Sequence, residues 1–198
     1  TEYSSEMINA ALTSQTPAEV VPSTDDNGHG TSMASLAAGG ANVDNQFIGA
    51  APEAAIAVVK MKEAKQYLRG YYLIREDTPC YQETDVMAGV RYLNELAERL
   101  EMPLVICLAI GTNQGSHTGS SPLCGLIETY GNFSNRAVVV GGGNEANQRH
   151  HFVDRFENVT ETKTVEIAVG AGVEGFIAEL WTALPNVMNI SVRSPSGE

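Results

Sequence analysis

Apolar residues recur at helical spacing in three stretches of the chain and run almost unbroken in three others. The helical spacing predicts one helix from about Ser4 or Ser5 to Leu12 and a second from a Thr84 cap to about Glu101. A third starts at Ser121 and Pro122 and ends near Gly131 or Ser134. The unbroken runs are typical of strands covered on both faces of a parallel sheet, and they lie at residues 54–61, 104–110 and 137–140. Because strands and helices alternate, we predict an α/β fold with right-handed crossovers.

Prolines and polar residues predict the connections between these elements. Pro17 and Pro22 indicate a loop after the first helix, and residues 42–52 indicate a turn-rich connection. Residues 62–82, with tyrosines, charges and Pro79, predict a surface insertion. Its aromatic side chains fit a satellite packing cluster better than a contact with a substrate or partner.

The pattern changes after residue 157. Residues 164–171, 176–182 and 187–194 have alternating or β-branched apolar positions, with turn residues between them. We therefore expect a C-terminal antiparallel β segment at 158–198. The chain ends before the strand that should follow the turn at 194–197, so this segment is expected to be truncated.

The composition narrows the classes of function. The chain has 198 residues, with 12 basic and 24 acidic side chains and a net charge of −12. This balance argues against nucleic acid or an anionic membrane surface as a partner. No apolar run reaches about 18 residues and no basic leader opens the chain, so we expect neither a membrane span nor a signal peptide.

The three cysteines predict neither a disulfide framework nor a metal site. Cys80, Cys107 and Cys124 are too widely spaced for either pattern. Cys107 lies within an apolar run, where we expect it to behave as a small buried hydrophobic residue.

The glycine-rich stretch around His29 carries the first candidate for chemistry. His29 lies between two glycines and precedes Thr31 and Ser32, either of which can cap a helix that begins at about Ser32. A neutral histidine at a helix start can accept a proton. We interpret Asp25 and Asp26 as loop or capping residues, because a carboxylate so close in sequence rarely reaches beneath the imidazole.

A second candidate follows the predicted strand 137–140. Gly141–Gly143 allow the backbone to approach a ligand closely, and Asn144 could donate its side-chain amide to a developing oxyanion. The alternative for Asn144 is an ordinary turn residue. The loop at 111–121 follows the preceding strand, where open α/β sheets bind ligands, and we interpret His117 in it as loop structure or a specificity contact.

Both stretches resemble motifs of the subtilisin-like serine proteases (subtilases). The segment Gly28-His29-Gly30-Thr31, with Ala38-Gly39, closely resembles the histidine motif of that family, although Ser35 replaces its usual glycine. The segment Gly49-Ala50-Ala51-Pro52 and the run after it are similar to the family's sequence after its histidine helix, and Gly141-Gly142-Gly143-Asn144-Glu145 is similar to the oxyanion motif. The resemblance implies an α/β fold with a three-layer parallel sheet and flanking helices.

The resemblance also implies roles for individual residues. His29 would be the general base and Asn144 the oxyanion donor of a Ser/His/Asp mechanism that hydrolyses peptide bonds. The backbone of Ala109, Ile110 and Gly111 would pair with a polypeptide substrate as an added strand, with alanine in place of the family's serine. No cofactor is implied. Many members bind calcium, but the acidic residues here form no recognisable loop motif, so metal binding stays open.

Two parts of that mechanism are missing from this sequence. No Asp-Ser-Gly or Asp-Thr-Gly motif occurs, and the family's serine motif is only imitated by residues 30–34. Ser32 is not the expected nucleophile, because it belongs to the helix of His29 and no proline follows Ser35. We therefore expect an internal piece of an endopeptidase, inactive alone, with the aspartate upstream and the serine downstream.

In this interpretation residues 1–157 form part of the catalytic domain, with an insertion at 62–82, and residues 158–198 begin an inserted or appended β domain. A pseudoprotease that binds or signals without chemistry is the alternative. A third interpretation makes 158–198 a surface for a protein partner. The insertion and the late β segment resemble larger bacterial members, including clostridial ones related to spore germination proteases, and the family implies a secreted, cell-surface or spore-associated protein.

Overall fold

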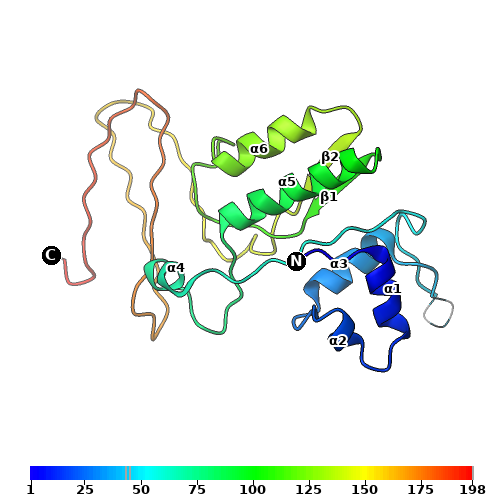
Figure 1. Cartoon of the computed structure of the whole chain (residues 1–198). Helices are drawn as coiled ribbons and strands as arrows, with labels where there is room; N and C mark the ends of the chain where they lie inside the picture. Colours follow the sequence, from blue (N-terminus) through cyan, green and yellow to red (C-terminus); the bar gives the residue numbers. More distant parts are fainter. Residues whose placement is uncertain (43, 45, 198) are drawn as a thin grey trace. The chain divides into compact units, whose positions relative to one another are not determined.

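The computed structural model describes residues 1–42, 44 and 46–197. The chain consists of two compact units, Thr1–Val58 and Val59–Glu198 (Figure 1). The expected boundary between a catalytic domain and a β domain at 157/158 stays a prediction. Part of the predicted connection at 42–52 lies outside the described residues, at 43 and 45.

Helices dominate the described part of the first unit, which forms α1 (Ser5–Thr13), α2 (Pro17–Val20) and α3 (His29–Ala38). α1 confirms the first predicted helix, and its N-cap is Ser4, whose side chain accepts a hydrogen bond from the Met7 amide at 3.4 Å. The loop predicted between Pro17 and Pro22 is wrong in part. Pro17 starts the short helix α2, because the fixed φ of proline suits the first helical position.

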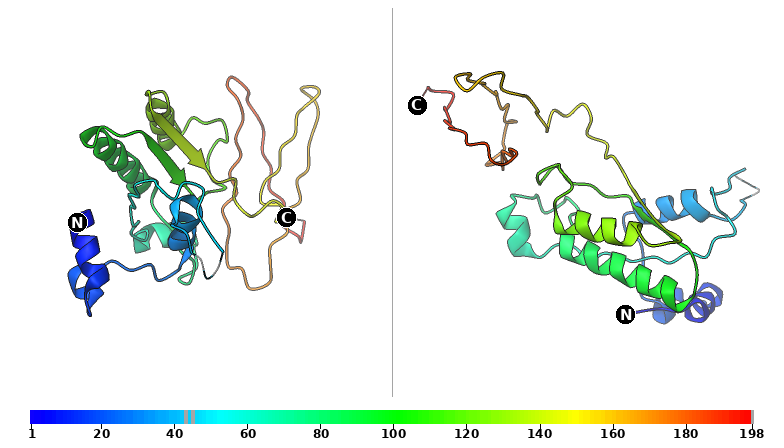
Figure 2. Two further views of the ribbon diagram at one scale, coloured as in Figure 1. Left: turned by 90° about the vertical axis from the view of Figure 1, so that its right-hand side faces the viewer. Right: turned by 90° about the horizontal axis from the view of Figure 1, so that it is seen from above.

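The second unit contains a two-stranded parallel sheet covered by helices on one face. β1 (Leu104–Leu108) pairs with β2 (Arg136–Val140), in a register that runs from Leu104 opposite Arg136 to Leu108 opposite Val140. α5 (Glu83–Arg99) and α6 (Pro122–Gly131) contact each other and the strands, and Figure 2 shows them on the same side of the sheet. These elements confirm the predicted helices and strands from residue 83 to 140.

The predicted start of α6 is found, whereas the predicted start of α5 is not. Ser121 caps α6 and accepts a hydrogen bond from the Cys124 amide at 3.2 Å, as expected. Thr84 does not cap α5, because the helix begins at Glu83, two residues before the start that a Thr84 cap would give, and Gln82 holds the cap position without a side-chain bond. The buried residues of α5 include Val90, which is 2% exposed and fills the centre of this small core.

Strand alternation decides which side chains of β1 are covered. Ile106 is 3% exposed, whereas Val105 is 69% exposed, and Cys107 and Val139 are exposed as well. The expectation that Cys107 is a buried hydrophobic residue is therefore wrong. It points to the face opposite Ile106, and α5 and α6 lie on the Ile106 face. A three-layer arrangement stays a prediction.

The run at 54–61 does not form the predicted strand. These residues have no assigned strand pairing, and Ile56 and Val58 are 56% and 69% exposed. A strand exists only through hydrogen bonds to a neighbouring strand, and an apolar run provides none by itself. The apolar pattern therefore indicated that the segment has the composition of a strand, but it could not show whether a neighbouring strand would pair with it.

A buried arginine organises the insertion at 62–82. Arg69, in α4 (Gln66–Tyr71), is 5% exposed. Its guanidinium donates to a carboxylate, a thiol and three backbone carbonyls of the same loop, namely Glu63 Oε2 (3.2 Å), Cys80 Sγ (3.0 Å) and the oxygens of Arg75 (2.9 Å), Glu76 (2.9 Å) and Thr78 (2.7 Å). The loop is thus a small structure folded around one charge, while Tyr67 and Tyr71 lie exposed on its outside.

The late segment, yellow to red in Figure 1, forms turns but none of the three predicted strands. The expected turns are present, with Val173 N–H donating to Gly170 O (3.3 Å), Asn186 to Ala183 (3.0 Å) and Gly197 to Ser194 (2.9 Å). Turns need only local bonds, whereas a ladder needs a correctly placed neighbour. Gly175 lies against the insertion, since a Cβ there would come within 2.8 Å of Leu73 Cδ1.

Candidate active site

His29 is the first residue of α3 and is exposed. The carboxylate of Asp25 holds this helix start, because it accepts hydrogen bonds from the amides of Asn27 (3.2 Å), Gly28 (2.8 Å) and Thr31 (2.8 Å) and from the Thr31 hydroxyl (2.7 Å). These bonds, those of Thr31 above all, hold the pKa of Asp25 well below its usual value. Asp25 is therefore the capping residue that we expected.

The helix of His29 begins three residues before the predicted start at Ser32. Neither Thr31 nor Ser32 is the cap; Gly28 holds that position with φ of +83°, in the left-handed region that favours glycine. Asp25 satisfies the free amides of the first turn from outside the helix, so the helix can start earlier. The Ser32 hydroxyl donates to Gly28 O at 2.8 Å, which fits the interpretation that Ser32 is not a nucleophile.

The other candidates meet at the carboxyl edge of the sheet in the second unit. The Gly141 amide donates to Leu108 O at 3.0 Å, extending the ladder by one bond. Residues 109–111 therefore leave β1 beside the glycines that leave β2. Asn144 follows Gly143, whose φ is +79°, and is exposed. The structure thus brings the predicted substrate segment and the predicted oxyanion donor to one edge, whereas His29 belongs to the other unit.

A side-chain bridge that the sequence did not reveal crosses this edge. Glu145 Oε2 accepts a hydrogen bond from Asn113 Nδ2 and pairs with His150 Nδ1 at 3.0 Å. These two partners, Asn113 first, lower the pKa of Glu145, since both stabilise the charged carboxylate. One signal could have suggested it, because Asn113 and Glu145 each follow a strand of the predicted parallel pair by five residues.

The loop after β1 is braced at two further points. His117 Nε2 lies 3.2 Å from Asn113 O, and its ring stacks on His151 with centroids 4.8 Å apart. The Gly115 amide donates to Glu179 Oε2 at 2.9 Å, which also accepts from Trp181 Nε1 at 2.9 Å. The contact to Asn113 O agrees with the interpretation of His117 as loop structure.

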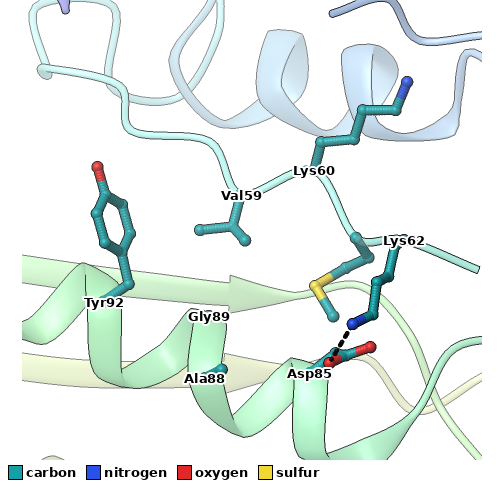
Figure 3. A pocket seen from close by; sticks show the side chains of 8 residues that line it. Val59, Lys60, Lys62, Asp85, Ala88, Gly89 and Tyr92 are labelled. Atoms are coloured by element: carbon teal, nitrogen blue, oxygen red, sulfur yellow. Dashed lines mark ion pairs between the residues drawn. The ribbon is translucent and has the colours of Figure 1, made fainter. Parts of the chain in front are cut away.

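A pocket beside α5 contains none of the predicted site residues (Figure 3). Val59, Gly89 and Tyr92 line it together with an ion pair between Lys62 Nζ and Asp85 Oδ1, at 3.3 Å. The Asp85 carboxylate lies in the first turn of α5, where the helix dipole favours negative charge. We therefore interpret the pocket as a packing feature between α5 and the chain before it.

The structure offers no evident metal centre in the residues that it describes. No three histidine, cysteine, aspartate or glutamate side chains come together there in a way that could hold an ion. Within the same residues, no helix is long and apolar enough to cross a membrane.

The parallel strands, the covering helices and the motif-bearing loops agree with a comparison to protein families. The family model of the subtilase family, peptidase S8, matches residues 5–178. The chain therefore belongs to the subtilase family, a family of serine peptidases, as its motifs predicted.

One solved structure supports the same assignment. It is the Clostridium perfringens CspB protease, which is 34% identical to this chain with a TM-score of 0.63. The match covers 73% of this chain and 29% of that protease, so the chain spans less than a third of its relative. A comparison with curated proteins gives no match.

Proposed function

We propose that this chain is part of a subtilisin-like serine endopeptidase that hydrolyses peptide bonds of polypeptide substrates. The single observation that carries the proposal is that residues 109–111 and the turn with Asn144 follow the carboxyl ends of two paired parallel strands, β1 and β2, in a chain that belongs to the subtilase family. The His29 motif, at the start of α3, supports it.

Each residue has a distinct task in this proposal. His29 takes the proton of a serine hydroxyl as that oxygen attacks the substrate carbonyl, and then gives the proton to the leaving amine. The Asn144 amide donates to the oxyanion that forms on the carbonyl oxygen. The main chain of residues 109–111 aligns the substrate by strand pairing.

The 198-residue chain by itself is proposed to lack activity. Its sequence holds motifs for the base and the oxyanion donor, and none for the orienting aspartate or the nucleophilic serine. Both are needed for nucleophilic attack, since a hydroxyl at its ordinary pKa is a weak nucleophile. Cleavage of a peptide by the purified 198-residue chain, abolished by His29→Ala, would overturn this part.

The test of the main proposal uses the full-length protein. A serine-directed fluorophosphonate should label it, and His29→Ala should abolish both labelling and cleavage of a fluorogenic peptide. Asn144→Ala should lower kcat more than it raises KM, because the amide acts on the transition state. Asn186→Ala, an exposed turn residue of the late segment, is the matched control and should leave both constants unchanged. A full-length protein that neither reacts with the probe nor cleaves peptides would instead be a pseudoprotease.

A further inference from the structure

The turn that carries Asn144 follows a glycine-rich exit from β2. Three consecutive glycines, Gly141–Gly143, separate it from β2, and Gly143 adopts φ of +79°. Glycines have the widest choice of backbone conformations, so the position of the next residue depends on contacts beyond them. Asn144 is exposed and therefore needs an outside support to hold its amide in one place.

Glu145 provides that support, since it follows Asn144 directly. Its Oε2 accepts from Asn113 Nδ2 and pairs with His150 Nδ1 at 3.0 Å. Asn113 belongs to the loop after β1, whereas Glu145 and His150 belong to the loop after β2. One carboxylate oxygen thus ties the two loops together next to the predicted oxyanion donor.

The Asn113 side of this bridge is itself held. Asn113 O lies 3.2 Å from His117 Nε2, and the His117 ring packs at a tilt against His151 of the loop after β2. The Gly115 amide donates to Glu179 Oε2 at 2.9 Å. The loop after β1 is therefore tied to the late segment through Glu179 and to the loop after β2 through His151, and Glu145 links the glycine-led turn to it.

We propose that Asn113 and Glu145 are positioning residues, which fix the Asn144 amide relative to the backbone of residues 109–111. This inference rests on the proposed function. An oxyanion donor must lie about 2.7–3.1 Å from the oxygen it stabilises, and a displacement of about 1 Å can cost roughly a hundredfold in rate. The bridge sets this spacing, because it spans the two loops that carry donor and substrate.

The test exchanges donor and acceptor in the full-length protein. Asn113→Asp places two carboxylates face to face and should lower kcat by about tenfold or more, with KM changed less than about twofold. Glu145→Gln keeps an acceptor oxygen and should cost less. The double variant restores one donor and one acceptor with the roles reversed, and should recover most of the lost kcat.

The matched control is Glu161→Gln. Like Glu145, Glu161 is a carboxylate with one amide partner and one basic partner, but these are the Glu157 backbone amide and the Lys163 side chain, away from the bridge. It should leave kcat and KM unchanged. Two results would overturn the inference. One is a kcat of the double variant that is no higher than the value expected from multiplying the effects of the two single variants. The other is a rise of KM at constant kcat in Asn113→Asp.

A second measurement does not depend on catalysis. In the 198-residue chain, the NMR amide signals of Gly143 and Asn144 should shift or broaden in Asn113→Asp and return in the double variant. The signals of β1 report whether the variant is folded, and Asn113→Ala replaces Asn113→Asp if it is not. Unchanged Asn144 signals in a folded variant overturn the inference. If the wild-type protein cleaves no peptide, the proposed function fails while this measurement still decides whether the bridge holds the turn.

Discussion

Replacing Arg69 by alanine should open the insertion at 62–82 while α5 and the sheet stay folded. Arg69 is 5% exposed, and its guanidinium reaches five acceptors of its own loop. All five belong to residues 63–80, so the loop depends on this side chain for its closure. None of these five acceptors belongs to the core around Val90.

The structure sets the size of the effect. The two terminal nitrogens of a guanidinium carry four hydrogens, so at most four of the five contacts are full hydrogen bonds. At a net value of about 1 kcal/mol each, the loop would lose up to about 4 kcal/mol. The three carbonyls belong to exposed residues and regain water, so we expect about 3 kcal/mol. Arg69→Lys should recover little, because an ammonium lacks the planar fork.

The assay is native-state hydrogen exchange by NMR. The amides of Ala64 and Ile74 close the loop by donating to Cys80 O and Arg69 O, both at 2.9 Å. A loss of about 3 kcal/mol speeds their exchange by roughly a hundredfold, if they exchange by local opening. Exchange in α5 should change little.

The control is Arg75→Ala, which removes a guanidinium of the same loop whose side chain is 81% exposed and pairs with Asp77. It should leave the exchange of both amides unchanged, because surface ion pairs contribute little. The reasoning is refuted if Arg69→Ala leaves the exchange of Ala64 and Ile74 within about twofold of wild type, or if Arg75→Ala has the same effect.

Caps, core packing and strand alternation give three further predictions. The pKa of Asp25 is lower in the folded chain than its ordinary value of 3.8, so its contribution to stability is complete above that pH and is lost as the pH falls towards the folded pKa. Asp25→Ala should therefore weaken the NMR helix signals of α3 at pH 7. Asp26→Ala, which removes the acceptor of the Thr24 hydroxyl, should not. Val90→Ala should lower the free energy of unfolding by about 2–3 kcal/mol in urea denaturation, because it opens a cavity at a residue that is 2% exposed. Equal destabilisation by Val105→Ala, at a residue that is 69% exposed, would contradict this prediction. A thiol reagent should modify Cys107, which is exposed, faster than the other two cysteines, which are half-buried; mass spectrometry of the labelled peptides gives the order.

Local signals in the sequence predicted α1, α5 and α6, but they did not predict α2 and α4 or the caps of α3 and α5. These three helices follow from apolar spacing, and Ser4, Ser121 and Pro122 act at the helix starts through neighbouring atoms. Pro17, by contrast, starts a helix where a loop was predicted. The turns at 170–173, 183–186 and 194–197 also formed as expected. Such features depend on residues a few positions apart, so the sequence contains all the partners that they need.

Features that depend on distant partners were predicted less well. The same kind of apolar run became a strand at 104–108, where β2 pairs with it, and an exposed segment at 54–61. The exposure of Cys107 depends on where α5 and α6 pack, and the early start of α3 depends on how Asp25 folds back. In each case the outcome depends on a group that lies outside the stretch of sequence from which the prediction was made.

The motifs around His29 and Asn144 indicated the family of this protein, because a motif is defined by residue types in a fixed order and the sequence contains that order directly. Only the tertiary structure decided that Asn113, Glu145 and His150 meet beside Asn144. The physical reason is the parallel pairing of β1 and β2, which brings the ends of two strands, 32 residues apart along the chain, to one edge. Hydrogen bonds act over a few ångströms, so a bridge of this kind appears only once the backbone has placed its donors and acceptors.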